Sequence, residues 1–147
     1  MMERSGGCLC GAVRLDAVLS KLAIVACHCT QCQRWTGGGP MMSVPVSKVT
    51  FVSDENIKEF SISDWGVRAI CAECGTPLYW RMMDGPVKYV TVGLLDDQTD
   101  LGITEEIFVD CRAPWRDAMP GAAQSTEAEQ NALLKAYLNE QSTGGSS

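Results

Sequence analysis

The chain has 147 residues, of which 46% are hydrophobic, and this size fits one domain with a single core. Its formal net charge of -6 argues against a general nucleic-acid-binding protein, because no basic run offsets the acidic excess. No apolar run approaches the roughly 18 residues of a membrane span. The N-terminal residues also lack the apolar core of a signal peptide, so we expect a cytoplasmic protein.

Short strands are predicted through most of the chain. Residues 1–7 are expected to be a frayed start, and residues 30–35 one helical turn that ends at the run Gly37-Gly38-Gly39-Pro40. Asp84-Gly85 predicts a hairpin turn. Alternating or branched apolar residues predict strands over 12–17, 22–26, 41–46, 48–52, 57–62, 67–70, 77–82, 87–94 and 107–109, with a break near Pro45.

The C-terminal residues predict the one long helix. Thr126 and Glu129 have the spacing of a capping box, and an apolar face follows them, formed by Leu133, Leu134, Tyr137 and Leu138. Residues 142–147 are expected to be disordered. We therefore expect a mainly β domain over residues 1–124, followed by a helix and tail over residues 125–147.

Eight cysteines are many for this length. An even count allows a disulfide framework, but a reducing cytosol opposes it. The spacings C-x-C, C-x-C-x-x-C and C-x-x-C suit a small ion better than distant cross-links, so we favour metal binding.

Cys8, Cys10, Cys71 and Cys74 can form one site. Residues two apart in an extended segment point to the same side, and a C-x-x-C turn brings its two sulfurs together. Four thiolates make a closed tetrahedral zinc site, whose role is structural.

Cys27, Cys29 and Cys32 then remain, and three thiolates leave one tetrahedral position open, as in catalytic zinc sites. His28 alternates with its neighbours, so we expect it to support the site through hydrogen bonds rather than to bind the ion. Cys111 is the other possible fourth ligand, although a small buried thiol is the favoured interpretation. Spacing alone also allows the three cysteines to pair with Cys71 and Cys74 instead.

The cysteine pattern, taken in order, resembles one known family. The motif Gly7-Cys8-x-Cys10-Gly11 is followed by Cys27-His28-Cys29-x-x-Cys32-x-Arg34 and then by Cys71-x-x-Cys74-Gly75. Together these are similar to the glutathione-dependent formaldehyde-activating (GFA, or CENP-V/GFA) family. The late segment Ile107-Phe108-Val109 with Arg112-Ala113-Pro114-Trp115 also resembles that family. Glu106 stands where many relatives have a histidine.

The resemblance implies an Mss4-like twisted β-sheet, the β-tent fold, with zinc knuckles and a short C-terminal helix. It implies a structural zinc on Cys8, Cys10, Cys71 and Cys74, and a catalytic zinc on Cys27, Cys29 and Cys32. It also implies a carbon–sulfur lyase activity, which joins formaldehyde and glutathione into S-hydroxymethylglutathione.

An acidic protein needs local arginines to bind the two carboxylates of glutathione. Arg34 is the favoured candidate, and the others are Arg14, Arg68 and Arg112. Trp35 and Trp115 are candidates for pocket walls or for core residues. Three other hypotheses stay open: a non-catalytic zinc-stabilised binding module, thiol–disulfide chemistry at the C-x-x-C pair, and a relative that acts on another thiol or aldehyde.

Overall fold

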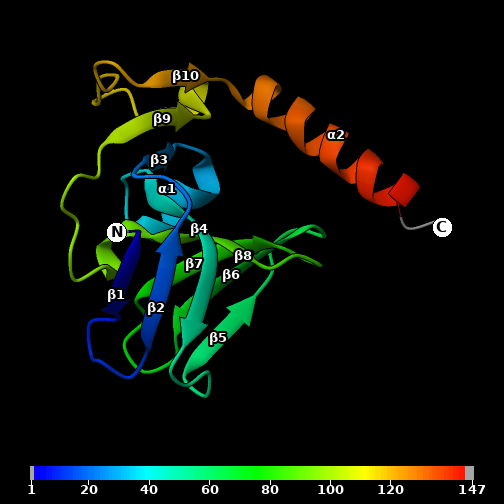
Figure 1. Ribbon diagram of the computed structural model, residues 1–147. Coiled ribbons are helices and arrows are strands. Elements are labelled where there is room, and N and C mark those ends of the chain that lie inside the picture. Colours follow the sequence, from blue (N-terminus) through cyan, green and yellow to red (C-terminus); the bar gives the residue numbers. More distant parts are fainter. Residues whose placement is uncertain (1, 145–147) are drawn as a thin grey trace.

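A computed structural model describes residues 2–144 and shows a mainly β protein (Figure 1). The strands are β1 (Glu3–Gly7), β2 (Arg14–Leu19), β3 (Ile24–Cys27), β4 (Met41–Phe51), β5 (Ile57–Phe60), β6 (Gly66–Cys71), β7 (Pro77–Met82), β8 (Val87–Thr91), β9 (Ile103–Ile107) and β10 (Ala123–Ser125). The helices are α1 (Thr30–Thr36) and α2 (Glu127–Gly144), with 3-10 turns η1 (Val92–Leu94) and η2 (Val109–Cys111). The predicted fold class, a mainly β sheet with a C-terminal helix, is confirmed.

Strand β4 joins the two parts of a ten-stranded mixed sheet. The main path runs β10-β9-β3-β4-β8-β7-β6-β5, and β2, with β1 outside it, branches from β4. The first part of β4 pairs with β3 and β8 as far as Pro45, and from Val46 onward it pairs with β2. The two predicted strands 41–46 and 48–52 are therefore one. Pro45 interrupts neither ladder, because it lies where β4 changes partners.

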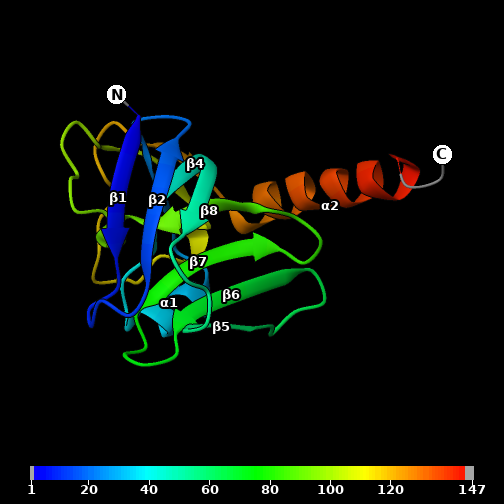
Figure 2. The same cartoon turned by 60° about the horizontal axis from the view of Figure 1, so that its bottom comes forward.

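The hydrophobic core lies between two parts of the sheet, which we call wings (Figure 2). One wing consists of β1, β2 and the end of β4, and the other consists of β5 to β8. Strand β2 alternates, so Leu15, Ala17 and Leu19 are buried while the residues between them face outward or are half-buried. The opposite wing contributes Leu78 and Val90, both fully buried. Burying a leucine or valine side chain contributes about 1.5–3 kcal/mol to folding, so this interface between the wings carries much of the stability.

Two predictions near the chain ends were wrong. Residues 1–7 are not a frayed start, because Glu3–Gly7 forms β1 and pairs antiparallel with β2. The last strand is not 107–109. Residues Ile103–Ile107 form β9, which pairs in parallel with β3, and β10 then pairs in parallel with β9. Glycine, and to a lesser degree glutamate, have low strand propensity, so β1 forms through its pairing with β2 rather than through its own residues.

The predicted capping box begins helix α2. The backbone N–H of Glu129 donates to Thr126 Oγ1 over 3.2 Å, and the N–H of Thr126 donates to Glu129 Oε1 over 3.3 Å. The helix continues to Gly144, so residues 142–144 are helical rather than disordered, and residues 145–147 lie outside the described residues. Its predicted apolar face is largely uncovered, since Leu133 is 64% exposed.

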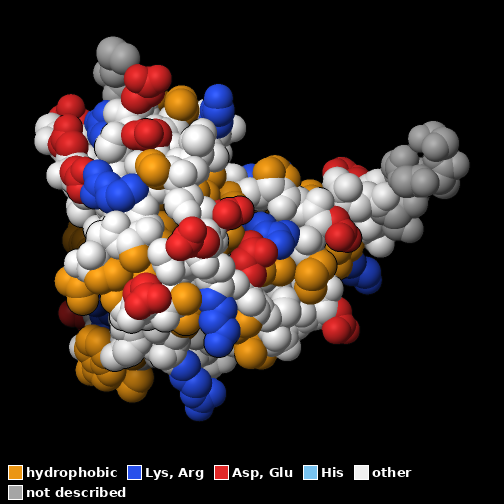
Figure 3. All heavy atoms as spheres, turned by 90° about the horizontal axis from the view of Figure 1, so that it is seen from below, with side chains coloured by type: hydrophobic (Ala, Val, Ile, Leu, Met, Phe, Trp, Pro, Cys, Tyr) orange, Lys and Arg blue, Asp and Glu red, His pale blue; other side chains and the backbone are white. Residues whose placement is uncertain are grey.

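Helix α2 extends away from the sheets, as all three overall views show (Figures 1 to 3). On the face shown in Figure 3, lysine and arginine side chains are interspersed with aspartate and glutamate. Among the described residues, no helix combines the length and the apolar character that crossing a membrane requires.

Candidate metal centres

Four cysteine sulfurs from two distant segments meet beside the core. Cys8 and Cys10 follow β1, Cys71 ends β6, and Cys74 lies in the turn before β7; their sulfur atoms all lie within 4.8 Å of one another. The Sγ atoms of Cys8 and Cys10 are 3.6 Å apart, and those of Cys10 and Cys71 are 3.9 Å apart. A disulfide needs about 2.05 Å, whereas tetrahedral zinc bonds of about 2.3 Å separate two sulfurs by roughly 3.8 Å.

Backbone N–H groups already point at these sulfurs. The N–H of Val13 donates to Cys8 Sγ over 3.3 Å, and the N–H of Ala12 donates to Cys10 Sγ over 3.5 Å. Glycines with φ of +85° at Gly11 and +79° at Gly75 complete the two turns, in a conformation that other residues rarely adopt. These N–H groups would stabilise thiolates, which are the forms that bind a metal.

A second cluster contains Cys27, Cys29 and Cys32, whose sulfurs also lie within 4.8 Å of one another. Cys27 ends β3, and Cys29 is the N-cap of α1, where its Sγ accepts the N–H of Cys32 over 3.3 Å. Hydrogen bonds from Cys27 and Cys32, together with that N–H and the charge of Arg68, outweigh burial and lower the pKa of the Cys29 thiol to about 2. Of the three sulfurs, Cys29 therefore carries negative charge first, because hydrogen bonds with Cys29 and Cys32, together with burial, raise the pKa of the Cys27 thiol.

The grouping into four and three is therefore what the structure shows. Cys71 and Cys74 belong with Cys8 and Cys10, and they do not join the second cluster as the alternative pairing required. The sulfur of Cys111 also lies outside the second cluster, and its thiol donates a hydrogen bond to Glu127 Oε2 over 3.5 Å. Within the described part of the chain, the second cluster has three protein donors.

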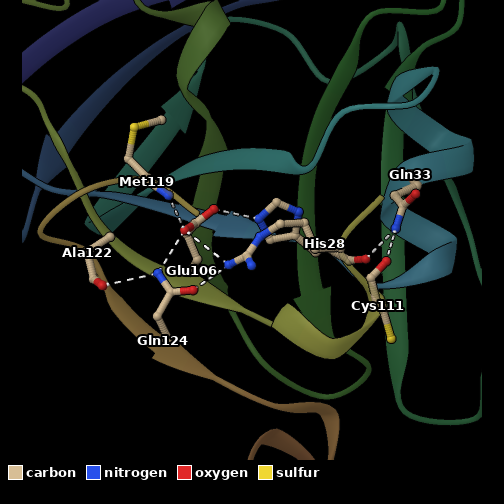
Figure 4. Close-up of polar contacts among 8 residues, drawn as sticks. His28, Gln33, Glu106, Cys111, Met119, Ala122 and Gln124 are labelled. Carbon is tan, nitrogen blue, oxygen red and sulfur yellow. Dashed lines mark hydrogen bonds and ion pairs between the residues drawn. The ribbon is translucent and has the colours of Figure 1, made fainter. Parts of the chain in front are cut away.

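His28 lies between two cysteines of the second cluster in the sequence, and its side chain points toward Glu106 (Figure 4). Its side chain is 1% exposed, and its Nε2 lies 2.7 Å from Oε1 of Glu106, which is equally buried. The N–H of His28 also donates to the carbonyl of Ile107 over 3.0 Å. The expected role of His28, a hydrogen-bonded support rather than a ligand, agrees with this geometry.

The carboxylate of Glu106 has four polar partners, of which His28 is one. Its Oε2 accepts the N–H of Met119 and the side-chain amide of Gln124, each over 2.8 Å, and Arg112 lies 3.4 Å away (Figure 4). Burial would raise the pKa of this carboxyl, but the bonds from Gln124, Met119 and His28, with the charge of Arg112, lower it to about 2. The ionised Glu106 thus ties the segment after β9 to the back of the cysteine cluster.

Gln33 makes a second tie. Its side-chain amide donates to the carbonyls of His28 and Cys111, both over 2.7 Å, and so joins α1 to η2 (Figure 4). No sequence pattern indicated this role of Gln33, or the pairing of His28 with Glu106. The single histidine between two cysteines was a signal, but nothing in the sequence could select its partner among 18 acidic residues.

The four candidate arginines have different surroundings. Arg14 is bound to Asp96 over 2.7 Å, and Arg112 contacts Glu106. Arg68 is 6% exposed and lies against the second cluster, with its guanidinium nitrogens 3.7 and 3.8 Å from Cys32 Sγ. Arg34 is exposed in the last turn of α1, and no ion pair joins it to another described residue.

The tryptophans differ as well. The ring of Trp35 is half-buried and stacks under the guanidinium of Arg68, whose central carbon lies 4.9 Å from the ring centroid. Trp115 is 70% exposed. Two hollows of the surface, of about 550 and 390 Å³, lie away from both tryptophans: one is lined by residues of β4, β5, β7 and β8, and the other by residues of β1, β2 and β4.

Comparison with known proteins gives the family. Residues 3–111 match the family described as glutathione-dependent formaldehyde-activating enzyme, GFA. The chain belongs to the GFA family. Both cysteine clusters lie within the matched residues, so the geometry above is that of a GFA domain.

Two relatives accompany this match. A protein of the fission yeast Schizosaccharomyces pombe, named an uncharacterized lyase, is 33% identical over 90 residues, which are 60% of this GFA chain and 65% of the relative. The match thus spans just under two thirds of that relative's length. A crystal structure of a Rhodobacter sphaeroides protein, 20% identical, superposes with a TM-score of 0.53 over 83% of this chain and 99% of that one. It has the same fold.

Proposed function

We propose that this chain is a zinc-dependent carbon–sulfur lyase, which adds the thiol of glutathione to formaldehyde and gives S-hydroxymethylglutathione. Membership of the GFA family supports the reaction class. The observation that carries the proposal is the three-sulfur cluster of Cys27, Cys29 and Cys32, which has no fourth protein donor in the described chain. Catalytic zinc sites use three protein ligands and leave the fourth position to substrate or water.

The donor sets fit zinc. Thiolates are soft ligands that select zinc over magnesium or calcium, and the sulfur separations of 3.6 and 3.9 Å in the four-cysteine cluster match a tetrahedral site. We assign that cluster a structural zinc. A zinc ion at the three-cysteine cluster would stabilise a substrate thiol as thiolate or polarise an aldehyde oxygen.

The residues around the three-cysteine cluster have positioning tasks. Strand β3 and helix α1 fix the three sulfurs, and His28 with Glu106 holds the strand end that carries Cys27. In the reaction the S–H bond of glutathione breaks, a C–S bond forms, and the proton passes to the former carbonyl oxygen, so nothing is oxidised or reduced. Holding the two reactants together is the main gain, because thiols add to formaldehyde unaided.

Arg34 is proposed to bind a glutathione carboxylate. It lies on α1, the helix that carries Cys32, and it is exposed without an ion-pair partner in the described chain. By contrast, Arg14 and Arg112 already contact carboxylates, and Arg68 is buried against sulfur. A free guanidinium near the cluster suits a carboxylate through two parallel hydrogen bonds.

The test is NMR exchange between free formaldehyde and its glutathione adduct. Zinc-loaded protein should speed the exchange at least about tenfold over the uncatalysed rate, and Cys29→Ser should abolish the gain while leaving the fold intact. Cys111→Ser serves as the matched control, because its sulfur lies outside the cluster, and it should keep the full gain. A wild-type protein that binds zinc but gives no acceleration would overturn the proposal and favour a binding module or another substrate.

A further inference from the structure

Arg68 is a buried positive charge beside the three-sulfur cluster. Strand β6 is covered on both faces: Ala69 and Cys71 belong to the hydrophobic core, while Arg68, one residue out of phase, reaches toward α1. Its guanidinium nitrogens donate to Cys32 Sγ over 3.7 and 3.8 Å and to Gln31 Oε1 over 3.2 Å. The Trp35 ring covers one face of the guanidinium at 4.9 Å.

Among the described residues, no carboxylate forms an ion pair with this guanidinium. Its partners are the sulfur of Cys32, the side-chain amide oxygen of Gln31 and the ring of Trp35, all from α1. A charge that is 94% buried is stable only with a compensating charge nearby. Since Gln31 and Trp35 are neutral, the compensating charge must come from the sulfurs of the cluster.

The positive charge of Arg68 affects a charged fourth ligand of the metal differently from a neutral one. Three thiolates with a divalent ion carry -3 + 2 = -1, and a fourth thiolate makes the site -2. With Arg68 included, those sums become 0 and -1. A neutral fourth ligand such as imidazole or water leaves the first sum unchanged. The attraction of Arg68 therefore acts on an anionic fourth ligand and hardly on a neutral one.

We propose that Arg68 makes the three-sulfur cluster selective for a thiolate as its fourth ligand, over neutral nitrogen or oxygen donors. Arg68 is then a specificity-determining residue that acts through charge. The proposal rests on the proposed function only in that both need a metal at this cluster, and it does not require formaldehyde as the second reactant. At a partly buried site, a unit charge several ångströms away changes affinity by about ten- to a hundredfold.

The test uses protein loaded with cobalt(II), whose visible absorption reports each new sulfur or nitrogen ligand. Wild-type protein is titrated with 2-mercaptoethanol, with the affinity expressed for the thiolate, and separately with imidazole. Cys29→Ser identifies which spectral change belongs to this cluster. We expect the thiolate to bind far more tightly than imidazole, and equal affinities in the wild-type protein would overturn the proposal without any variant.

Variants then separate charge from packing. Arg68→Met should weaken thiolate binding about tenfold or more and leave imidazole binding within about twofold, while Arg68→Lys, which keeps the charge, should restore most of the thiolate preference. Lys135→Met removes one positive charge from the exposed face of α2 and should change neither affinity. Equal losses for both ligands in Arg68→Met would assign Arg68 a purely structural role.

Metal content and folding are measured for every variant. If Arg68→Met does not load cobalt, Arg68→Gln takes its place with the same expectation. Lack of formaldehyde–glutathione acceleration together with retained thiolate selectivity would reject the proposed function and keep this inference. If the protein accelerates the reaction of formaldehyde with glutathione but its three-sulfur cluster does not prefer a thiolate, the proposed function is kept and this inference is rejected.

Discussion

Nε2 of His28 lies 2.7 Å from Oε1 of Glu106, and each side chain is 1% exposed. His28, the only histidine of the chain, lies between Cys27 and Cys29, and Glu106 lies in β9, which pairs with β3. The pair therefore joins the cysteine cluster to β9. Because Glu106 also holds Met119 and Gln124, one carboxylate fixes both the cysteine cluster and the segment that leads to β10. Removing this carboxylate should therefore affect stability and cluster geometry together.

The first prediction concerns Glu106→Gln. An amide offers a donor where His28, Met119 and Gln124 all donate, so the variant should be about 1–3 kcal/mol less stable at pH 7, as measured by denaturant unfolding. The pKa of Glu106 lies below its ordinary value of 4.5, at about 2. The stabilisation by the ionised carboxyl is therefore complete above about pH 4.5 and is lost as the pH falls toward 2.

The difference in unfolding free energy between wild type and Glu106→Gln should accordingly shrink below pH 4.5. For this comparison Cys29→Ser is introduced into both proteins, so acid loss of metal from the three-sulfur cluster does not contribute to the difference, and loss from the four-sulfur cluster affects both proteins alike. Glu105→Gln on the neighbouring position of β9 is the control, and it should change stability by less than about 0.5 kcal/mol. A difference that stayed constant down to pH 2.5 would contradict the assigned role of the ionised carboxyl.

The second prediction concerns Cys74→Ser in the four-sulfur cluster. Structural zinc sites contribute on the order of 10–16 kcal/mol to the folding of small domains, which is comparable to the whole stability of a typical domain. The variant should be unfolded or insoluble, as judged by circular dichroism and sedimentation. A soluble variant that melts cooperatively with one zinc per chain would show that this cluster is dispensable for folding.

The third prediction concerns Cys29→Ser in the three-sulfur cluster. Zinc per chain, measured by atomic emission, should fall from two to one, while the melting transition stays cooperative. The reason is that the three sulfurs lie in one short stretch and join no distant strands. If the variant unfolds instead, the second zinc is structural and the binding-module hypothesis gains support.

The fourth prediction concerns the close approach of β1 to η1. A Cβ on Gly6 would overlap the carbonyl of Leu94, with its carbon only 2.7 Å away. Gly6→Ala should therefore cost at least about 2 kcal/mol, because both partners are backbone and neither can rotate away. Gly93→Ala is the matched control, since a Cβ there meets no atom within 4 Å. Equal melting temperatures for the two variants would mean that the backbone adjusts freely.

Much of the fold could be predicted because it follows from local patterns. Pro77–Met82 was predicted with its correct bounds, and the hairpin at Asp84-Gly85 was found because such a turn has its own residue signature. The cysteine spacings predicted metal binding and favoured a grouping into four and three, but they also allowed Cys27, Cys29 and Cys32 to pair with Cys71 and Cys74, and only the structure excludes that alternative.

The remainder depended on contacts between distant segments. Strand β1 has glycines where a strand prefers branched residues, so only its partner β2 makes it a strand. The single strand β4 was divided in two because Pro45 normally ends a strand, and its place between two ladders was invisible in the sequence. Arg68 was one of four candidate arginines, and only the packing of α1 on β6 set it beside Cys32.

The two clusters differ in how far they reach along the chain. Cys10 and Cys71 are separated by 61 positions, and a cross-link that closes a loop of this length removes entropy from the unfolded chain worth about 4 kcal/mol. The three-sulfur cluster spans only residues 27–32, so an unfolded chain could still bind zinc there. Zinc would then stabilise the protein through the four-sulfur site alone, and excess zinc would raise the melting temperature less than two equal sites would.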